Sequence, residues 1–205
     1  MRMNQTDLEK LKVLDHMTEG DYEAFLYDCD GTLADNMMAH KLAYQEVAAN
    51  YGIDLDLNLI HETAGWPTVL VAKEISKRYN IPLPDSFASE KSAVFIEKHI
   101  QKTLPIVFVY EHLKKNVGKK KIGVVSGGSR STVSITLSVL GLTDLIDVLV
   151  CAGETPNGKP YADPFLKAAH ELGVDPKKCL VFEDGDPGTR AAEAAGMKWI
   201  RVDKI

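Results

Sequence analysis

Short apolar runs alternate with segments of helical hydrophobic period along most of the chain. A mostly apolar run of strand length occurs five times, and helical patterns separate one run from the next. Alternating strands and helices are typical of an α/β fold, so we predict a doubly wound parallel sheet. An amphipathic helix is also predicted at residues 6–17, before the first strand. The predicted strands are residues 23–28, 122–125, 147–151, 180–182 and 197–202.

One region interrupts this alternation, because residues 37–103 contain helical patterns and no apolar run of strand character. Since the βα pattern resumes afterwards, we predict a small α-helical cap at residues 37–103, inserted into a core formed by residues 1–36 and 104–205. Hinges between cap and core are expected near residues 34–36 and 102–105. The predicted cap helices are residues 37–51, 57–63, 68–79 and 85–102.

Composition narrows the classes of protein that the chain can belong to. Its 205 residues are 45% apolar and 26% charged, with a net charge of −5 and no basic tail, which argues against nucleic acid as a partner. No apolar run approaches the roughly 20 residues of a membrane helix, and no signal peptide is recognisable, so no membrane association is expected. The scattered cysteines, Cys29, Cys151 and Cys179, are typical of reduced thiols. We expect a cytoplasmic monomer.

Acidic residues follow two of the predicted strands. Asp28 and Asp30 stand one residue apart at the end of the first strand, and Glu183 and Asp184 follow the fourth. The carboxyl ends of parallel strands form the crevice in which such sheets bind ligands, so these carboxylates should converge there. Carboxylates at a buried strand end would be costly without a compensating charge, which a cation with oxygen ligands such as Mg²⁺ would supply. A plainer interpretation of the Asp-Gly sequence is a solvated turn.

Groups suited to a phosphate occur in two other loops of the same predicted edge. Ser126 follows the second strand and precedes two glycines with accessible backbone N–H groups, and Lys159 lies in the loop after the third strand. Considered alone, the serine is more simply explained as a helix N-cap and the lysine as a loop residue. Residues 153–159 also have the spacing of a nucleotide-binding P-loop, but Pro160 replaces the required Ser or Thr, so this motif is rejected.

The order of these motifs, Asp-x-Asp-Gly-Thr, then Ser, then Lys, then Glu-Asp, resembles that of the haloacid dehalogenase-like (HAD) hydrolases over residues 22–205. Residues 181–188 and 191–197 make the chain similar to the β-phosphoglucomutase-like sugar phosphatases, especially fructose-1-phosphate-type phosphatases. The resemblance implies a Rossmann-like core with a small cap after the first motif and Mg²⁺ as cofactor. It also implies a phosphatase that acts on a small phosphorylated metabolite, with a sugar phosphate as the expected substrate.

The resemblance further implies roles for residues of the core. Asp28 would be the nucleophile that forms an aspartyl-phosphate. Asp30 would be the general acid for the leaving oxygen and then the base for water, which leads us to expect a raised pKa for Asp30. Ser126 and the backbone N–H of Gly127 would bind the phosphoryl oxygens, and Lys159 would bridge the nucleophile and the phosphoryl group.

The metal ligands are implied in the same way. The carboxylates of Asp28 and Asp184 and the backbone carbonyl of Asp30 would hold Mg²⁺, and Glu183 would be a further ligand or would support the others. Mg²⁺ and Lys159 would both favour the anionic form of Asp28. Apart from His40, the histidines have no metal-binding spacing and are expected to be structural or exposed.

Two residues of the predicted cap are candidates for substrate contact. His40 lies one turn from Tyr44 on a helix that leans over the active site in the resembled branch, although packing would also explain a histidine there. Trp66 lies in a Gly-Trp-Pro-Thr sequence at 65–68, where phosphoglucomutases have an arginine for a second phosphate, and a core role explains it equally well. The missing arginine favours a phosphatase over a hexose-phosphate mutase. A non-catalytic binding protein on this fold is the other alternative.

Overall fold

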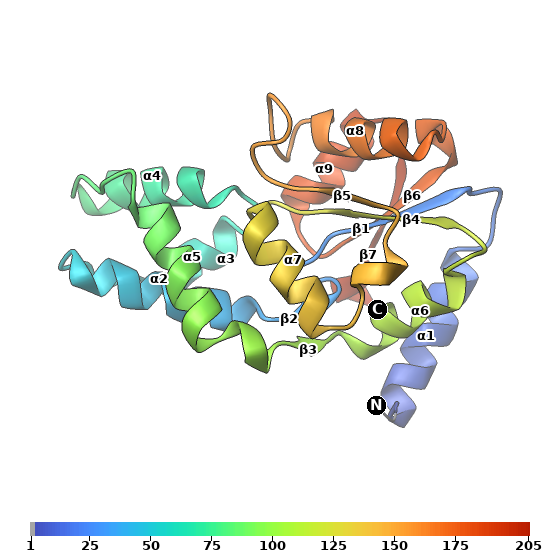
Figure 1. Cartoon of the computed structure of the whole chain (residues 1–205), viewed down its shortest axis with the longest axis horizontal. Helices are drawn as coiled ribbons and strands as arrows, with labels where there is room; N and C mark the ends of the chain where they lie inside the picture. The colour runs from blue at the N-terminus through green and yellow to red at the C-terminus, as the bar shows by residue number, and fades with distance from the viewer. Residues whose placement is uncertain (1–2) are drawn as a thin grey trace.

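The core of the molecule is a five-stranded parallel sheet. In the computed structural model, which describes residues 3–205, the strands lie in the order β5-β4-β1-β6-β7 (Figure 1). Every neighbouring pair is parallel, and β1 lies in the middle. The sheet and the helices on both of its faces confirm the predicted α/β fold. The strands are β1 (Ala24–Tyr27), β4 (Lys121–Val125), β5 (Val148–Val150), β6 (Cys179–Glu183) and β7 (Lys198–Arg201).

Helices cover both faces of the sheet because its strands are apolar on both sides. Phe25 and Tyr27 of β1 pack in one cluster with residues of α1, α6 and α7, whereas Ala24 and Leu26 pack with residues of α8 and α9 (Figure 1). A strand buried on both faces forms a continuous apolar run, which is why the pattern predicted these strands. The helices are α1 (Gln5–Met17), α6 (Val107–Asn116), α7 (Arg130–Val139), α8 (Asp163–Leu172) and α9 (Asp186–Ala194), with 3₁₀ turns at Thr143–Leu145, Pro176–Lys178 and Val202–Lys204.

The chain between the first and second sheet strands forms a group of helices at one end of the molecule (Figure 1). Their apolar side chains gather around Ile75 and Phe87, in a cluster distinct from those that cover the sheet. The last helix begins at Phe87 and ends at Lys98, so it is shorter than predicted, and a 3₁₀ turn at Ile100–Lys102 follows it. That residues 37–103 form a separate domain stays a prediction. These helices are α2 (Met37–Asn50), α3 (Leu57–Glu62), α4 (Thr68–Tyr79) and α5 (Phe87–Lys98).

The two connections between these helices and the sheet are joined to each other. β2 (Ala34–Asp35) pairs antiparallel with β3 (Leu104–Pro105), at the two places where hinges are predicted. Pro105 pairs with Ala34, and α6 begins only at Val107. Two-residue strands are too short to produce a recognisable alternation, so the sequence pattern could not predict them.

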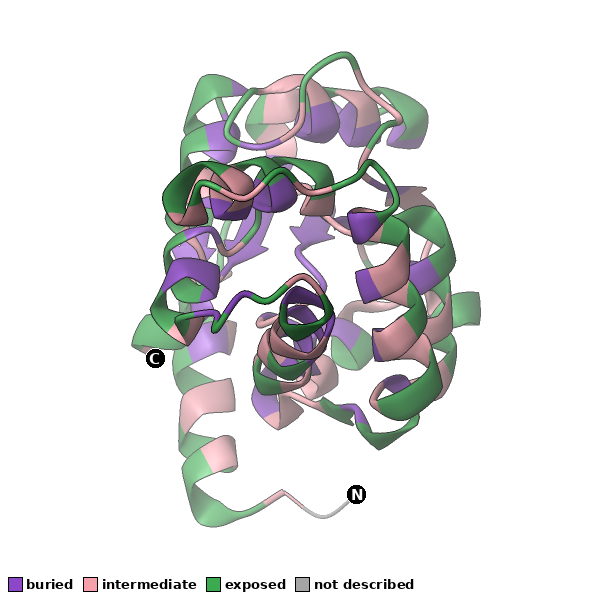
Figure 2. Ribbon diagram, turned by 90° about the vertical axis from the view of Figure 1, so that its left-hand side faces the viewer, coloured by how far each residue is buried: buried purple, intermediate pink, exposed green. Residues whose placement is uncertain are grey.

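Helix α1 lies against the core through one buried residue near its C-terminal end. Figure 2 shows that the turns near the N-terminus are largely exposed, whereas Leu14 farther along is fully buried in the core. Asn4 caps the helix in a capping box with Asp7, which explains its start one residue before the predicted one. Within residues 3–205, no helix is both long and apolar enough to cross a membrane.

Candidate active site

The neighbouring strands β1 and β6 bring three carboxylates together at their carboxyl ends. Asp28 follows β1 directly, and its backbone N–H donates to the carbonyl of Phe182 on β6 at 2.9 Å. Asp28, Glu183 and Asp184 each offer an oxygen within 4.8 Å of the others, which is a spacing that a metal ion can bridge. The carboxylate of Asp30 is not a member of this group. The structure thus brings together three of the four acidic residues that the sequence singled out.

Lys159 lies between two of these carboxylates. Its ammonium donates to Asp28 Oδ1 at 2.6 Å, to Glu183 Oε1 at 2.6 Å and to the carbonyl of Val125 at 2.8 Å. The lysine is only 4% exposed. Burial alone would lower its pKa, but the two carboxylates outweigh burial and raise it, so the side chain is a cation at neutral pH.

One ammonium does not neutralise three clustered carboxylates, of which Asp28 and Glu183 are buried. Burial raises the pKa of Asp28 to about 7, against the opposing effect of Lys159. Burial also raises the pKa of Asp184 to about 7, and the charge of Glu183 adds to the rise. The pKa of Glu183 itself is raised to about 7 by burial. The raised pKa values indicate that one ammonium is not enough to keep all three carboxylates ionised at neutral pH, and a divalent cation would favour their anionic forms.

Two glycines leave room for these carboxylates. A Cβ on Gly31, whose φ is +92°, would lie 2.3 Å from Asp184 Oδ2, and a Cβ on Gly188 would lie 1.7 Å from Glu183 Oε1. Thr32 donates to Asp184 Oδ1 at 3.1 Å, and the backbone N–H groups of Asp184 and Gly185 donate to Glu183 Oε2. Glu183 is held through both oxygens, which suits a supporting role better than a free metal ligand.

Ser126 completes the site from the strand on the other side of β1. It follows β4, and its buried hydroxyl accepts the backbone N–H of Gly128 at 3.1 Å. A Cβ on Gly127 would lie 2.5 Å from the carbonyl oxygen of Gly65, so glycine lets the loop at 64–67 approach the core. The predicted phosphate-binding residues therefore face the loop that contains Trp66.

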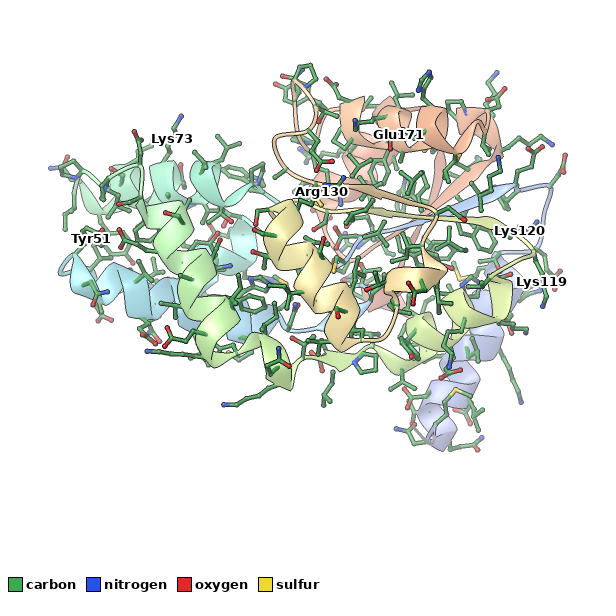
Figure 3. The ribbon with its side chains drawn as sticks, viewed as in Figure 1. Tyr51, Lys73, Lys119, Lys120, Arg130 and Glu171 are labelled. Atoms are coloured by element: carbon green, nitrogen blue, oxygen red, sulfur yellow. The ribbon has the colours of Figure 1, made fainter. Side chains whose placement is uncertain are left out.

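A pair of residues that the sequence did not reveal ties the start of α7, which follows the Ser126 loop, to the loop after β5 that carries Lys159. Arg130, at the start of α7 (Figure 3), donates to Glu154 and to the carbonyl of Leu149 at 2.6 Å. Glu154 in turn accepts the backbone N–H of Cys151 at 3.1 Å. No local sequence signal points to this pair, because the two residues are 24 positions apart.

The pKa of Asp30, which is expected from the sequence to be raised, is lowered instead. Asn36 Nδ2 donates to Asp30 Oδ1 at 2.6 Å, and His40 Nε2 lies 3.3 Å from the same oxygen. Burial would raise the pKa of Asp30, but His40 and Asn36 outweigh burial and lower the pKa to about 2. The expected raised pKa is therefore wrong for this state. Asn36 occupies the N-cap position of α2, but its side chain makes no capping hydrogen bond and turns to the Asp30 carboxylate instead.

A second buried lysine contacts His40 on the side of the ring that faces away from Asp30. Lys91 of α5 is 3% exposed, and its ammonium lies 2.6 Å from His40 Nδ1 and 4.6 Å from the centre of the Tyr44 ring. Because an ammonium can only donate, Nδ1 accepts and the ring proton lies on Nε2, facing Asp30. Burial lowers the pKa of Lys91 to about 8. The sequence indicated the burial of Lys91 only weakly, through its position four residues from both Phe87 and Phe95 on one helix face.

Asp28, Asp30 and Ser126 of the core line one pocket together with residues of the helices at 37–98, whereas Lys159, Glu183 and Asp184 are not part of its lining. The pocket holds about 530 Å³ of space outside the protein atoms, part of it open to solvent. Both predicted cap residues line it, His40 on the buried side and Trp66 at 36% exposure. The other residues of the lining are Asp28, Asp30, Met37, Tyr44, Ile60, Thr63, Ala64, Gly65, Thr68, Val71, Lys91, Ser126, Gly127 and Gly128.

Known proteins resemble this chain over nearly its whole length. It is 32% identical over 182 residues to the fructose-1-phosphate phosphatase YqaB of Escherichia coli, covering 88% of this chain and 96% of that protein. It is 30% identical to the phosphorylated carbohydrates phosphatase of Thermotoga maritima, covering 87% and 83%. The solved β-phosphoglucomutase of Clostridium difficile superposes with a TM-score of 0.75 at 28% identity, covering 87% and 83%.

The family assignment follows from these comparisons. The predicted class of enzyme, a phosphatase, is confirmed by the relatives. The sequence model of the haloacid dehalogenase-like hydrolases matches residues 25–202, which include all four motifs. The chain therefore belongs to the haloacid dehalogenase-like hydrolases.

Proposed function

We propose that this phosphatase hydrolyses a small phosphomonoester, with a sugar phosphate as the substrate class, in a Mg²⁺-dependent reaction through an aspartyl-phosphate. The observation that carries the proposal is the placement of Asp28. Its carboxylate accepts a hydrogen bond from the Lys159 ammonium, offers an oxygen within 4.8 Å of one from Asp184, and lines the pocket together with Ser126. Phosphoryl transfer depends mainly on such positioning and charge neutralisation.

The donors present fit a hard divalent cation. Asp28 and Asp184 are the carboxylates best placed to hold Mg²⁺ with the backbone carbonyl of Asp30, because both oxygens of Glu183 already accept hydrogen bonds. When bound, Mg²⁺ would neutralise negative charge on the cluster and on the phosphoryl oxygens.

The residues of the core account for both steps of the reaction. In the first, a carboxylate oxygen of Asp28 attacks phosphorus, the bond to the leaving oxygen breaks, and Asp30 gives that oxygen a proton. In the second, Asp30 takes a proton from a water molecule that attacks phosphorus, the bond to Asp28 breaks, and inorganic phosphate leaves. Ser126 and Lys159 donate to the phosphoryl oxygens in both steps.

The protonation of Asp30 links the first step to the cap residues. In the state described, the contacts with His40 and Asn36 keep Asp30 anionic, which is the form needed for the second step. For Asp30 to act first as an acid, the contact with His40 must loosen when the substrate enters. His40 and its partner Lys91 are therefore expected to respond to the leaving group.

The pocket suits a hydroxyl-rich leaving group that carries no second phosphate. His40, Tyr44, Thr68 and Lys91 offer hydrogen-bonding groups around it. The pocket has no arginine among its described lining residues, and its one lysine, Lys91, already contacts His40, whereas a mutase must hold the second phosphate of a bisphosphate intermediate. This favours a phosphatase over a mutase, and the named activities of the E. coli and T. maritima relatives support a phosphorylated carbohydrate.

Phosphate release from a panel of phosphorylated sugars and a generic aryl phosphate, with and without Mg²⁺, tests the proposal. We expect Mg²⁺-dependent release, fastest with a sugar monophosphate, and no stimulation by a sugar bisphosphate. Asp28→Asn is the control for contaminating activity. Release that persists after chelation of Mg²⁺, or turnover that requires a bisphosphate activator, would contradict it.

A further inference from the structure

A buried chain of hydrogen bonds connects α1 with the strand that carries Asp28. Tyr27, which directly precedes Asp28, is fully buried, and its hydroxyl lies 2.9 Å from Nδ1 of His112 on α6. Nε2 of the same imidazole lies 3.2 Å from the hydroxyl of Thr18, the residue that ends α1. These three side chains have no part in the chemistry proposed above.

The direction of each hydrogen bond in this chain can be assigned. The Thr18 hydroxyl donates to the backbone carbonyl of Asp15 at 2.9 Å, so it accepts the Nε2–H of His112. Nδ1 of His112 then has a free lone pair, to which the Tyr27 hydroxyl donates. Burial lowers the pKa of His112 to about 4, so its ring is neutral at pH 7, as this assignment requires. Every polar group from Tyr27 to the last turn of α1 is thereby satisfied.

The same side chains pack against both strands that deliver the acidic residues. The ring of Tyr27 stacks on Phe182, with centroids 4.4 Å apart and planes 11° apart, and the His112 ring lies 5.1 Å from Phe182. Tyr27 directly precedes Asp28 on β1, and Phe182 directly precedes Glu183 on β6. The position of the Tyr27 ring therefore affects the separation of the carboxylates that follow the two aromatic residues.

Helix α1 closes this arrangement from outside. Leu14 of α1 is fully buried in the same core cluster, and Asp15 pairs with Lys115 of α6 at 2.6 Å. His112 has no exposed surface. Without α1, its Nε2–H would lose its acceptor, and water would reach the aromatic layer beneath the site.

We propose that α1 is a positioning element for the acidic cluster. Thr18 orients His112, His112 orients Tyr27, and the stack of Tyr27 on Phe182 sets the separation of Asp28 and the acidic pair on β6. Thr18, His112 and Tyr27 are positioning residues that touch neither substrate nor metal. The inference rests on the proposed function only in that Mg²⁺ serves as its probe.

Mg²⁺ binding to the full chain, measured by titration calorimetry alongside the Mg²⁺ dependence of phosphate release, tests the inference. Thr18→Val keeps the shape of the side chain and removes its hydroxyl, and Tyr27→Phe keeps the ring. We expect each to raise the Mg²⁺ dissociation constant about three- to tenfold. The double variant should bind no more weakly than the weaker single variant, because both break the same chain. Thr18→Ser, which restores the hydroxyl, should bind as the unaltered chain does.

Leu14→Val is the matched control, because it loosens the packing of α1 on α6 and leaves the hydrogen-bond chain intact. It should lower the thermal midpoint and change the dissociation constant by less than about twofold. Unaltered Mg²⁺ binding in Tyr27→Phe, or equal weakening in Leu14→Val, would show the inference to be wrong. If Thr18→Val does not fold, Tyr27→Phe decides.

A chain that neither binds Mg²⁺ nor releases phosphate would overturn the proposed function, and the inference is then decided by NMR. The backbone amide signals of Asp28 and Asp184 should shift in Tyr27→Phe and Thr18→Val but not in Leu14→Val. Signals that shift in none of the three, or equally in all, would overturn the positioning role independently.

Discussion

The two buried lysines, Lys159 beside the acidic cluster and Lys91 in the pocket, are held in different ways. Lys159 of the core lies between carboxylates that two neighbouring strands deliver, and the ladder of the sheet fixes both strands. Lys91, by contrast, contacts His40, and only through it reaches Asp30 of the core. Within residues 3–205, no carboxylate lies within ion-pair distance of Lys91. The same type of side chain thus has a raised pKa in the core and a lowered pKa, about 8, on α5.

This difference separates the core cluster, whose geometry must stay fixed, from the Lys91–His40 pair, which can respond to the substrate. Charges paired across a parallel sheet keep their geometry whether or not substrate is present, which is what a nucleophile and its metal require. A lysine–histidine pair that reaches the core carboxylates through Asp30 would lose that contact in a movement of the helices away from the sheet. We therefore expect changes in the core cluster to abolish turnover, and changes in the Lys91–His40 pair to alter turnover by degrees and according to substrate.

The largest effect is expected at the nucleophile. Asp28→Asn removes the attacking anion and should lower the turnover number by about 10⁴-fold or more. The fold should persist, because the change removes one of three clustered carboxylates and keeps the shape of the side chain. Phosphate release under saturating substrate measures the first effect, and the thermal midpoint the second. Turnover within tenfold of the unaltered chain would show that Asp28 is not the nucleophile.

Removing the core lysine should damage both stability and rate. Lys159→Met leaves Asp28 and Glu183 without their cation, and loss of one partner of a buried pair costs about 3–5 kcal/mol. The folded-state pKa values of both carboxylates are already raised and would rise further. Carboxylates with a raised folded-state pKa stabilise the fold while they are protonated, and this stabilisation is lost as pH rises through the folded-state pKa. The loss of unfolding free energy in Lys159→Met should therefore be larger at pH 8 than at pH 5.

Denaturant unfolding of this variant at the two pH values, in the absence of Mg²⁺, measures the difference. A deficit that is independent of pH would mean that the lysine contributes through packing and not through charge. The rate is expected to fall by about 10²–10³-fold, as for other preorganised donors.

The same contrast explains what the sequence could predict. The core motifs lie at the ends of strands, and a parallel sheet brings strand ends together whatever the rest of the chain does, so Asp28, Ser126, Lys159 and Asp184 were all recognisable. Lys91 reaches His40 only because α5 packs on α2, and the hydrophobic pattern of neither helix predicts this packing. The protonation of Asp30 was mispredicted for the same reason, because its partners come from the start of α2 as the structure places it.

The Lys91–His40 pair offers a more graded test of the comparison. Lys91→Met keeps the aliphatic length that packs on Tyr44 and Phe95 and removes the charge. We expect kcat/KM for a sugar phosphate to fall about 10²-fold, with a smaller fall for an aryl phosphate that lacks hydroxyl groups. Stability should change little or rise, because a buried ammonium with no carboxylate partner is removed.

Lys73→Met is the matched control for this change. Lys73 is exposed on α4 and points away from the pocket (Figure 3). It should leave the kinetics of both substrates unaltered. An equal loss of kcat/KM for the sugar and aryl phosphates in Lys91→Met would place the lysine in the chemistry itself and would weaken the distinction drawn between core and cap.

The smallest effect is expected at the second buried histidine, His112, which belongs to the core and should influence stability where His40 influences activity. Burial lowers its folded-state pKa to about 4, despite the opposing charge of Asp15, from an ordinary value of 6.5. Between these values the unfolded chain binds a proton that the folded chain does not, so the stabilisation is complete above pH 6.5 and is lost as pH falls toward 4. The loss should reach about 3 kcal/mol.

His112→Gln should flatten the acid limb, which is the fall in the free energy of unfolding between pH 6.5 and 4 measured by denaturant unfolding. His16→Gln, at an exposed site, should not. An acid limb of unchanged slope in His112→Gln would mean that carboxylates with a lowered folded-state pKa, such as Asp30, and not this histidine, govern stability at low pH.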